Sequence, residues 1–256
     1  MYQVQLYFIH LFAMLPFCVY HRAPAYVISS EFPNTLLQQH KNGHFRFHRV
    51  MQSLNGIAVL SAITRAFSQG QVSARNLIGG LGDLSIHYLL HRHFPTLARY
   101  RISCNYELTH HRPWCHACPR CAHAYLFFLA LGADPLENGF KKRMLGNGAR
   151  QWFATFRKDL HVKDRYRRFY RDEEHWAFLK AYANGNREPL TRRAVEMIGD
   201  SSGRYLAKME KKIFRNQIRP GSPLERDAFD LYRQLLQGPK RFSGQSFDPK
   251  SCLPAY

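Results

Sequence analysis

The chain has 256 residues, of which 45% are hydrophobic and 14% aromatic. This apolar content suffices for a packed core and excludes a wholly disordered protein, and the length fits one large domain or one domain with an extension. The 37 Lys and Arg residues outnumber the 18 Asp and Glu residues, and the formal net charge of +19 favours a polyanionic partner such as RNA, nucleotide phosphates or an acidic membrane surface.

The N-terminal segment is apolar over residues 6–20 and predicts a buried helix over 3–15 that leads into a strand. The Ala-Pro-Ala sequence at 23–25 resembles the cleavage site of a secretory signal peptide. However, no Lys or Arg precedes the apolar run, which also contains His10 and Pro16. The run is too short to cross a bilayer comfortably, so we expect no membrane span.

The next segments predict an α/β domain over residues 1–102. Residues 25–29 are β-branched and aromatic and predict a buried strand. The polar loop at 30–34 follows the carboxyl end of that strand, which is where ligands bind in open α/β sheets. Apolar residues then recur at helical spacing over 50–67 and 84–94, and a further apolar helix is predicted over 122–132, beyond this domain in the region 103–150.

Residues 151–256 predict a basic helical extension. Segments 151–183 and 204–237 are charged and aromatic-rich, and breaker-rich stretches at 184–189 and 199–203 separate them. The last twenty residues resemble a tail that is ordered only when it docks on another surface.

Residues 157–176 of this extension mix basic and aromatic side chains, a composition that suits single-stranded nucleic acid. Arg167, Arg168 and Arg171 are the candidate phosphate contacts. The alternative is an amphipathic helix whose aromatic side chains lie in the core and whose charges face solvent.

Four of the six cysteines fall within residues 104–121, in the region 103–150 between the two predicted domains. Three of them have the spacing C-x2-C-x2-C, which is too tight for a set of disulfides and suits a metal in a reducing, cytoplasmic compartment. Zinc takes four soft ligands at tetrahedral corners. We therefore predict a structural zinc site whose ligands are Cys104, Cys115, Cys118 and Cys121.

Two other interpretations of the cysteines remain open. They could be buried free thiols, or two of them could form a redox-active dithiol. Four nearby histidines could each replace one cysteine as a ligand: His110, His111, His116 and His123.

The residues from Ser103 to Pro135 (SCNYELTHHRPWCHACPRCAHAYLFFLALGADP) resemble the zinc knuckle of ATP-pyrophosphatase-type enzymes related to 7-cyano-7-deazaguanine synthase. The WC-x2-CPRC sequence and the apolar helix after it are most similar to the muropeptide epimerases, which act on UDP-N-acetylmuramoyl-L-alanyl-L-glutamate with ATP. VISSEFPNT (27–35), RVMQSLNG (49–56) and LGDLSIHYLLHRHFP (81–95) extend the resemblance more loosely, so that it covers about residues 20–145.

The resemblance implies a partial Rossmann-like sheet of the kind found in nucleotide α-hydrolases. It also implies that Glu31, Asn34, Gln52 and Ser53 lie on the substrate side, and it assigns no catalytic residue. Without the resemblance, helix capping would explain Gln52 and Ser53, and a solvated turn would explain Glu31 and Asn34.

One departure from the family pattern concerns ATP. These enzymes bind ATP and Mg2+ through an S-G-G-x-D-S loop after the first strand, and this sequence contains none. Residues 78–85 (IGGLGDLS) lack the leading serine and have a different Gly-to-Asp spacing. We therefore expect Met1 to fall inside the catalytic domain, with the ATP-binding half missing or supplied by a partner chain or an upstream domain.

Two functions follow as expectations. The first is a zinc-containing, ATP-dependent, carboxylate-activating enzyme, or a remnant of one. The second is a non-catalytic, zinc-stabilised basic module that binds RNA or a larger assembly.

Overall fold

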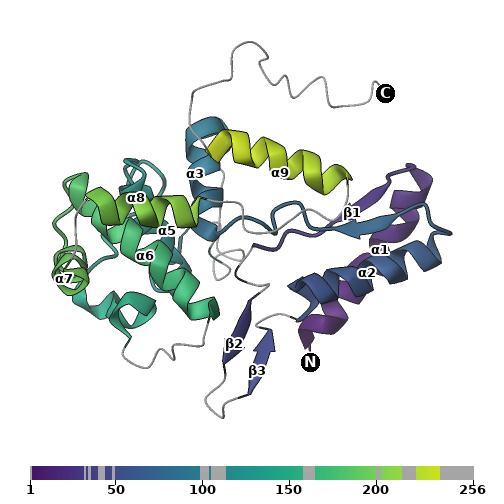
Figure 1. The fold of residues 1–256 in the computed structure, drawn as a ribbon, viewed down its shortest axis with the longest axis horizontal. Coiled ribbons are helices and arrows are strands. Elements are labelled where there is room, and N and C mark those ends of the chain that lie inside the picture. The colour runs from purple at the N-terminus through teal and green to yellow at the C-terminus, as the bar shows by residue number, and fades with distance from the viewer. Residues whose placement is uncertain are drawn as a thin grey trace.

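The computed structural model describes residues 2–31, 33, 36–39, 44–47, 50–98, 104, 114–157, 165–199, 203–214 and 223–236. It is mostly helical, with one parallel and one antiparallel pair of short strands among these residues. Figure 1 shows a helical group on the left, an α/β group on the right and two packed helices above the middle. We call residues 2–31 and 50–75 the N-terminal lobe and residues 114–214 the C-terminal lobe.

The N-terminal lobe is a strand–helix–strand unit preceded by a long helix. Its two strands are parallel, and Tyr26 is in register with Ala74. A small cluster of buried side chains, which includes Leu11, Ile57 and Leu60, joins the helices to the strands. The elements are α1 (Tyr2–Tyr20), β1 (Ala25–Val27), the 3-10 turn η2 (Val50–Gln52), α2 (Leu54–Phe67) and β4 (Ser73–Arg75).

The start of α2 is fixed by a serine cap and a close backbone approach. The Ser53 side chain accepts a hydrogen bond from the Gly56 N–H (3.1 Å) and donates one to the Val50 carbonyl (2.6 Å). A β-carbon on Gly56 would lie 2.2 Å from that carbonyl oxygen, so only glycine fits where η2 meets the helix.

A hairpin and a helix pair lie between the lobes. The hairpin consists of β2 (Leu37–Gln39) and β3 (Phe45–Phe47), which are antiparallel, and β2 contacts α6. The sequence pattern does not predict this hairpin. Near the C-terminal end of the described chain, α9 (Pro223–Leu236) packs on α3 (Asp83–His93), which is followed by α4 (Pro95–Ala98). Leu81, Leu89 and Leu235 form the small core between them.

The C-terminal lobe holds the largest core. Aromatic rings of Phe127, Phe128, Phe153 and Phe178 are almost completely buried in it. Residues on both sides of position 150 contribute to this core. The elements are α5 (Pro119–Ala130), the 3-10 helices η3 (Asn147–Trp152) and η4 (Ala154–Phe156), α6 (Arg165–Ala183), α7 (Pro189–Ile198) and α8 (Gly203–Ile213).

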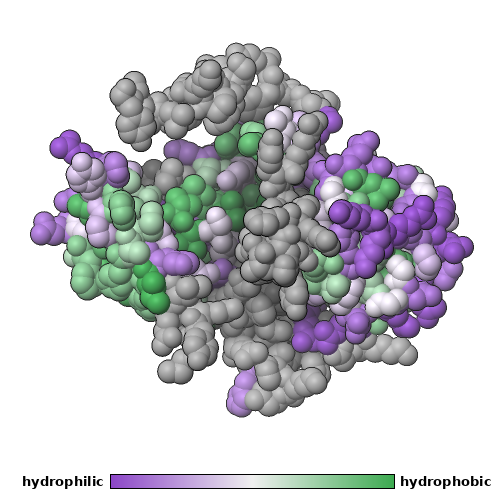
Figure 2. All heavy atoms as spheres, turned by 180° about the vertical axis from the view of Figure 1, so that it is seen from behind, coloured by the Kyte–Doolittle hydropathy of each residue, from purple (hydrophilic) through white to green (hydrophobic). Residues whose placement is uncertain are grey.

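Hydrophilic and hydrophobic surfaces lie on different lobes. Figure 2 shows hydrophilic residues on the side formed by α6, α7 and α8, and hydrophobic residues exposed on the side of α1 and α2. No helix in the described part of the chain is long and apolar enough to cross a membrane.

The predicted elements agree with the observed ones in type and differ mainly in length. The N-terminal helix reaches Tyr20 rather than residue 15, and the strand predicted over 25–29 covers 25–27. The prediction that both elements are buried is wrong, because β1 is half-buried to exposed and α1 exposes Phe12, Phe17 and Tyr20. The described chain is mainly helical and contains a small parallel strand pair, which is consistent with the predicted α/β class. The predicted tail lies outside the described residues.

Candidate metal centre and polar site

The four predicted cysteines converge to one point. Their sulfur atoms all lie within 4.8 Å of one another, and the structure places no other such group of His, Cys, Asp or Glu side chains in its described residues. Cys115 and Cys121 have sulfurs 3.7 Å apart, and Cys104 and Cys118 have sulfurs 3.9 Å apart. A tetrahedral ion with four thiolates at about 2.3 Å has sulfurs about 3.8 Å apart, so the arrangement fits a tetrahedral metal.

The local backbone conformation orients the thiols of Cys115, Cys118 and Cys121 toward one another. Cys118 is the N-cap residue of α5, and its sulfur accepts the Cys121 N–H at 3.5 Å. The Cys115 sulfur accepts the Ala117 N–H at 3.4 Å. His116 adopts a left-handed backbone conformation with φ of 58°, which turns the chain between the first two cysteines. Pro119 then starts the helix at a position where no N–H is needed.

Burial changes the acidity of two of these thiols. Burial, partly offset by the Ala117 N–H and reinforced by neighbouring thiols, raises the pKa of Cys115 to about 11. Burial also raises the pKa of Cys121 well above its usual range. Four thiolates are therefore stable together only when a bound cation balances their charge.

The nearby histidines have other partners. His116 Nε2 accepts the Lys141 N–H at 2.9 Å, and His123 Nε2 lies 3.0 Å from the Glu174 carboxylate. His110 and His111 lie outside the described residues. Among the described residues, the group that could hold a metal ion therefore consists of the four cysteines.

The cysteine cluster is part of the core of the C-terminal lobe. Cys104 and Cys121 are buried members of that core. Next to the site, Trp114 stacks on Phe140 with ring centroids 4.5 Å apart, and its indole N–H donates to the Asn138 carbonyl at 2.8 Å. A metal here would tie the segment at Cys104 to the start of α5, which is a structural role.

A second polar group of residues lies at the carboxyl ends of β1 and β4. Asn76 follows β4, and its side chain exchanges two hydrogen bonds with the Ser30 backbone, at 3.2 Å and 2.9 Å. The Ser30 hydroxyl donates to the Gln52 carbonyl at 3.2 Å. These bonds hold the two strand ends and η2 together. Because the sequence pattern does not predict β4, it gives no indication that Asn76 belongs here.

The four predicted substrate-side residues differ in what surrounds them. Gln52 is buried, its Nε2 donates to the Tyr7 hydroxyl, and its Oε1 has no hydrogen-bond partner among the described residues. Ser53 serves as the helix cap of α2, and Glu31 is half-buried near the same strand end. Asn34 lies outside the described residues.

Glu173 on α6 is a buried carboxylate that the sequence does not reveal. Its Oε1 accepts the Leu84 N–H at 3.1 Å at the N-terminus of α3, and its Oε2 has no partner in the described chain. Burial and the charge of Asp83, with smaller contributions that include Glu31, raise its pKa well above the usual range. The bond joins residues 89 positions apart, so no local pattern could signal it.

The predicted nucleic-acid residues lie on the first part of α6. Arg167, Arg168 and Arg171 are half-buried, and Arg167 and Arg168 already interact with neighbouring groups. Phe169 and Trp176 are buried, so their rings are not available to stack on bases. For these two residues, the structure agrees with the alternative prediction of an amphipathic helix whose aromatic side chains lie in the core.

Comparison with models of known protein families finds no match, and neither curated proteins nor solved structures show a significant similarity to this chain.

Proposed function

We propose that this chain is the zinc-bearing, substrate-side part of an ATP-pyrophosphatase-type enzyme that resembles the muropeptide epimerases. In this proposal the polypeptide that binds ATP and Mg2+ is a separate segment, because the S-G-G-x-D-S loop is absent from the sequence. The observation that carries the proposal is the polar group at the carboxyl ends of two parallel strands, where Ser30, Asn76 and Gln52 are joined by hydrogen bonds.

The parallel strand pair supports an incomplete α/β sheet of the Rossmann-like kind. Parallel strands are normally found in sheets that are covered on both faces, and a two-stranded sheet is marginal alone. Among the described residues, β1 and β4 pair only with each other. A further polypeptide could therefore add strands at either edge.

The surface of α1 supports the same conclusion. The helix contains no charged residue, and a helix that is apolar all round is normally buried. Leu11 and Leu15 face the core, but Phe12, Phe17 and Tyr20 are exposed, with 82% of Tyr20 accessible. Figure 2 shows this hydrophobic surface on the side of the N-terminal lobe. In the proposal, the ATP-binding half covers it.

The zinc ion would have a structural role in this enzyme. Its ligands would be the four cysteines, and a site with four thiolates has no open position for substrate. The ion would fix α5 relative to Cys104 and so hold the C-terminal lobe against the polar site.

The proposed chemistry begins at a carboxylate of the substrate. The carboxylate oxygen attacks the α-phosphorus of ATP, pyrophosphate leaves, and an acyl adenylate forms. The activated carbonyl acidifies the adjacent C–H, so that its proton can be removed and returned on the opposite face, and water then releases AMP. In this proposal the substrate would be bound by Glu31, which is half-buried, and by Gln52, whose buried Oε1 has no hydrogen-bond partner among the described residues.

The test is reconstitution of the two halves. The purified chain is mixed with a separately expressed ATP-binding half of a muropeptide epimerase, with ATP and UDP-N-acetylmuramoyl-L-alanyl-L-glutamate, and pyrophosphate release is measured. We expect release only when both halves are present, and a loss of at least about tenfold for Glu31→Gln, whereas the exposed-site control Glu137→Gln retains activity. The proposal fails if the mixture is inactive while the same ATP-binding half is active with its own C-terminal half.

A further inference from the structure

The exposed surface of the C-terminal lobe is strongly basic. Within the described residues of this lobe, 13 Lys and Arg residues are exposed but only four Asp and Glu residues are. Three of its other carboxylates are buried, because Glu173, Glu174 and Glu188 bind backbone N–H groups inside the fold. Because these three carboxylates lie inside the fold, few exposed acidic side chains balance the exposed Lys and Arg side chains.

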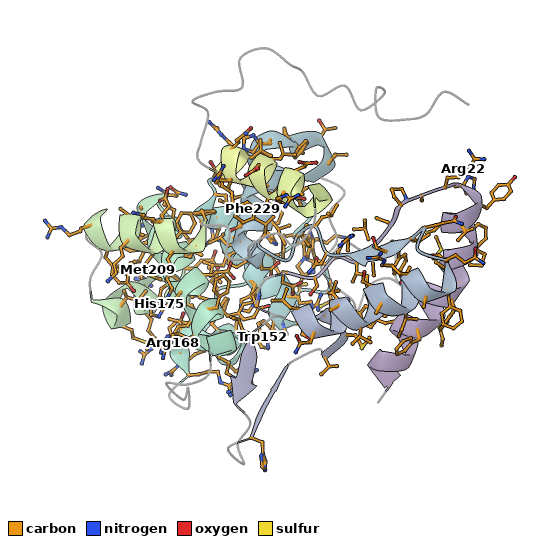
Figure 3. All side chains as sticks on the ribbon, turned by 45° about the vertical axis from the view of Figure 1, so that its right-hand side comes forward. Arg22, Trp152, Arg168, His175, Met209 and Phe229 are labelled. Carbon is orange, nitrogen blue, oxygen red and sulfur yellow. The ribbon has the colours of Figure 1, made fainter. Side chains whose placement is uncertain are left out.

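Helix α8 concentrates this charge on one face. Arg204, Lys208, Lys211 and Lys212 are spaced so that they share the outer face of the helix, and all four are exposed. Met209 and Ile213 occupy the opposite, buried face. Figure 3 shows Met209 and His175 in the region where α8 packs on α6. We call these four basic residues the α8 stripe.

Three members of the stripe are free to bind an external anion. Lys212 forms an ion pair with Asp172, whereas Arg204, Lys208 and Lys211 have no acidic partner in the described part of the chain. With a helical rise of 1.5 Å per residue, the stripe extends about 10 Å from Arg204 to Lys211. One strand of a nucleic acid carries a phosphate about every 3.4 Å along its axis, so this length faces roughly three phosphates.

We propose that the α8 stripe is a binding surface for the phosphate backbone of nucleic acid. Contacts to phosphates position the chain without reading the base sequence, and the absence of exposed aromatic residues on described α8 agrees with that mode. The surface lies on α8 and not at the half-buried arginines of α6. The inference does not depend on the proposed enzymatic function.

The surroundings of the stripe disfavour a lipid surface and a folded protein partner. A helix that lies on a membrane inserts its apolar face, but the apolar face of α8 is packed in the core. Of the exposed large hydrophobic residues among the described ones, only Met197 lies on α6, α7 or α8. The surface therefore lacks the apolar anchors on which tight protein–protein contacts depend.

Fluorescence anisotropy with a labelled 20-nucleotide single-stranded RNA tests the proposal across a range of salt concentrations. In the stripe variant, Arg204, Lys208 and Lys211 are all replaced by Gln. The matched control replaces Lys141, Lys142 and Arg143 by Gln, which removes the same charge from an exposed loop of the same lobe. Circular dichroism checks that both variants are folded.

We expect the stripe variant to lose at least tenfold in affinity at 100 mM salt, and the slope of log affinity against log salt to fall by about two. The control should lose less than about threefold. Equal losses in both variants would show that net charge alone is responsible, and would overturn the proposal. So would an absence of RNA binding by the unmodified chain, or a preference for vesicles containing 30% phosphatidylserine that the stripe variant abolishes.

Discussion

A β-carbon on Gly82 would lie 2.3 Å from the Glu173 carboxylate oxygen Oε1. Gly82 is the N-cap residue of α3, and Glu173 approaches it from α6, so this contact joins the C-terminal lobe to the helix that follows β4. The same β-carbon would lie 2.8 Å from two ring carbons of Phe169. Position 82 therefore requires glycine because a larger side chain would overlap its neighbours. Its backbone φ of −78° would be accessible to any residue.

Gly82→Ala should destabilise the protein because the methyl group displaces Glu173 or Phe169. Gly146 provides a matched control, since it is also an N-cap residue, with φ of −77°, and a β-carbon added there would meet nothing within 4 Å. We expect Gly82→Ala to lower the free energy of unfolding by about 1–3 kcal/mol more than Gly146→Ala. Urea denaturation of the two variants measures the difference, and equal effects would contradict this account of the contact.

Glu173 should make stability depend on pH. Its pKa is raised in the folded state, so the folded protein binds this proton more tightly than the unfolded chain. The protonated Glu173 side chain therefore stabilises the fold most at pH values below the pKa that it has in the unfolded chain. This contribution is lost as the pH rises through the higher pKa of Glu173 in the folded protein. Glu173→Gln keeps an oxygen for the Leu84 N–H and removes the titration. We expect the variant to gain stability relative to the unmodified protein between pH 5 and pH 8, measured by urea denaturation; a constant difference across that range would contradict the raised pKa.

Glu174 should be essential to the local fold. Its carboxylate accepts hydrogen bonds from the Ala154 N–H, the Thr155 N–H and the Thr155 hydroxyl at 2.7–2.9 Å, and it also pairs with His123. Glu174→Ala leaves the two backbone donors buried without a partner, which should cost about 3 kcal/mol or more. The exposed Glu196→Ala on α7 is the control, with an expected change within about 0.5 kcal/mol in the same denaturation experiment.

The cysteine cluster should hold one zinc ion per chain. Metal analysis of purified, tag-free protein measures the content, and Cys104→Ser or Cys121→Ser should abolish stoichiometric zinc and lower the melting temperature, because metal binding is coupled to folding. Cys18, outside the cluster, is half-buried and provides the control, since Cys18→Ser should retain the metal. A metal-free but fully stable unmodified protein would rule out a structural ion.

The candidate metal ligands can be predicted because most of them are close together in the sequence. Three thiols at C-x2-C-x2-C spacing are brought together by one turn and one helix start, and Cys104 needs only to arrive as the fourth soft ligand. The long apolar helices can be predicted for a similar reason, since helical periodicity extends over ten or more residues.

The polar site can be predicted only in part because its contacts join distant segments. The loop at Ser30 is expected from the strand before it, but β4 has the sequence Ser-Ala-Arg and carries no β-branched or aromatic residue to signal a strand. Asn76 therefore has no signal in the sequence either. Glu173 lies in a run of charged residues that is typical of a solvated face, and tertiary packing alone buries it.

The two lobes have separate hydrophobic clusters of very different size. Among the described residues, the main cluster of the C-terminal lobe contains 25 buried side chains, of which Leu84 and Cys104 come from outside residues 114–214, and the cluster in the N-terminal lobe contains six. We expect the smaller cluster to open without global unfolding, so that amide protons of α2 exchange with solvent long before those of α5 and α6. Thermal melting would then proceed in two steps, and one transition temperature would not describe it. Any polypeptide that covers α1 would slow exchange in the smaller unit, so its binding would be coupled to the folding of the lobe that it touches.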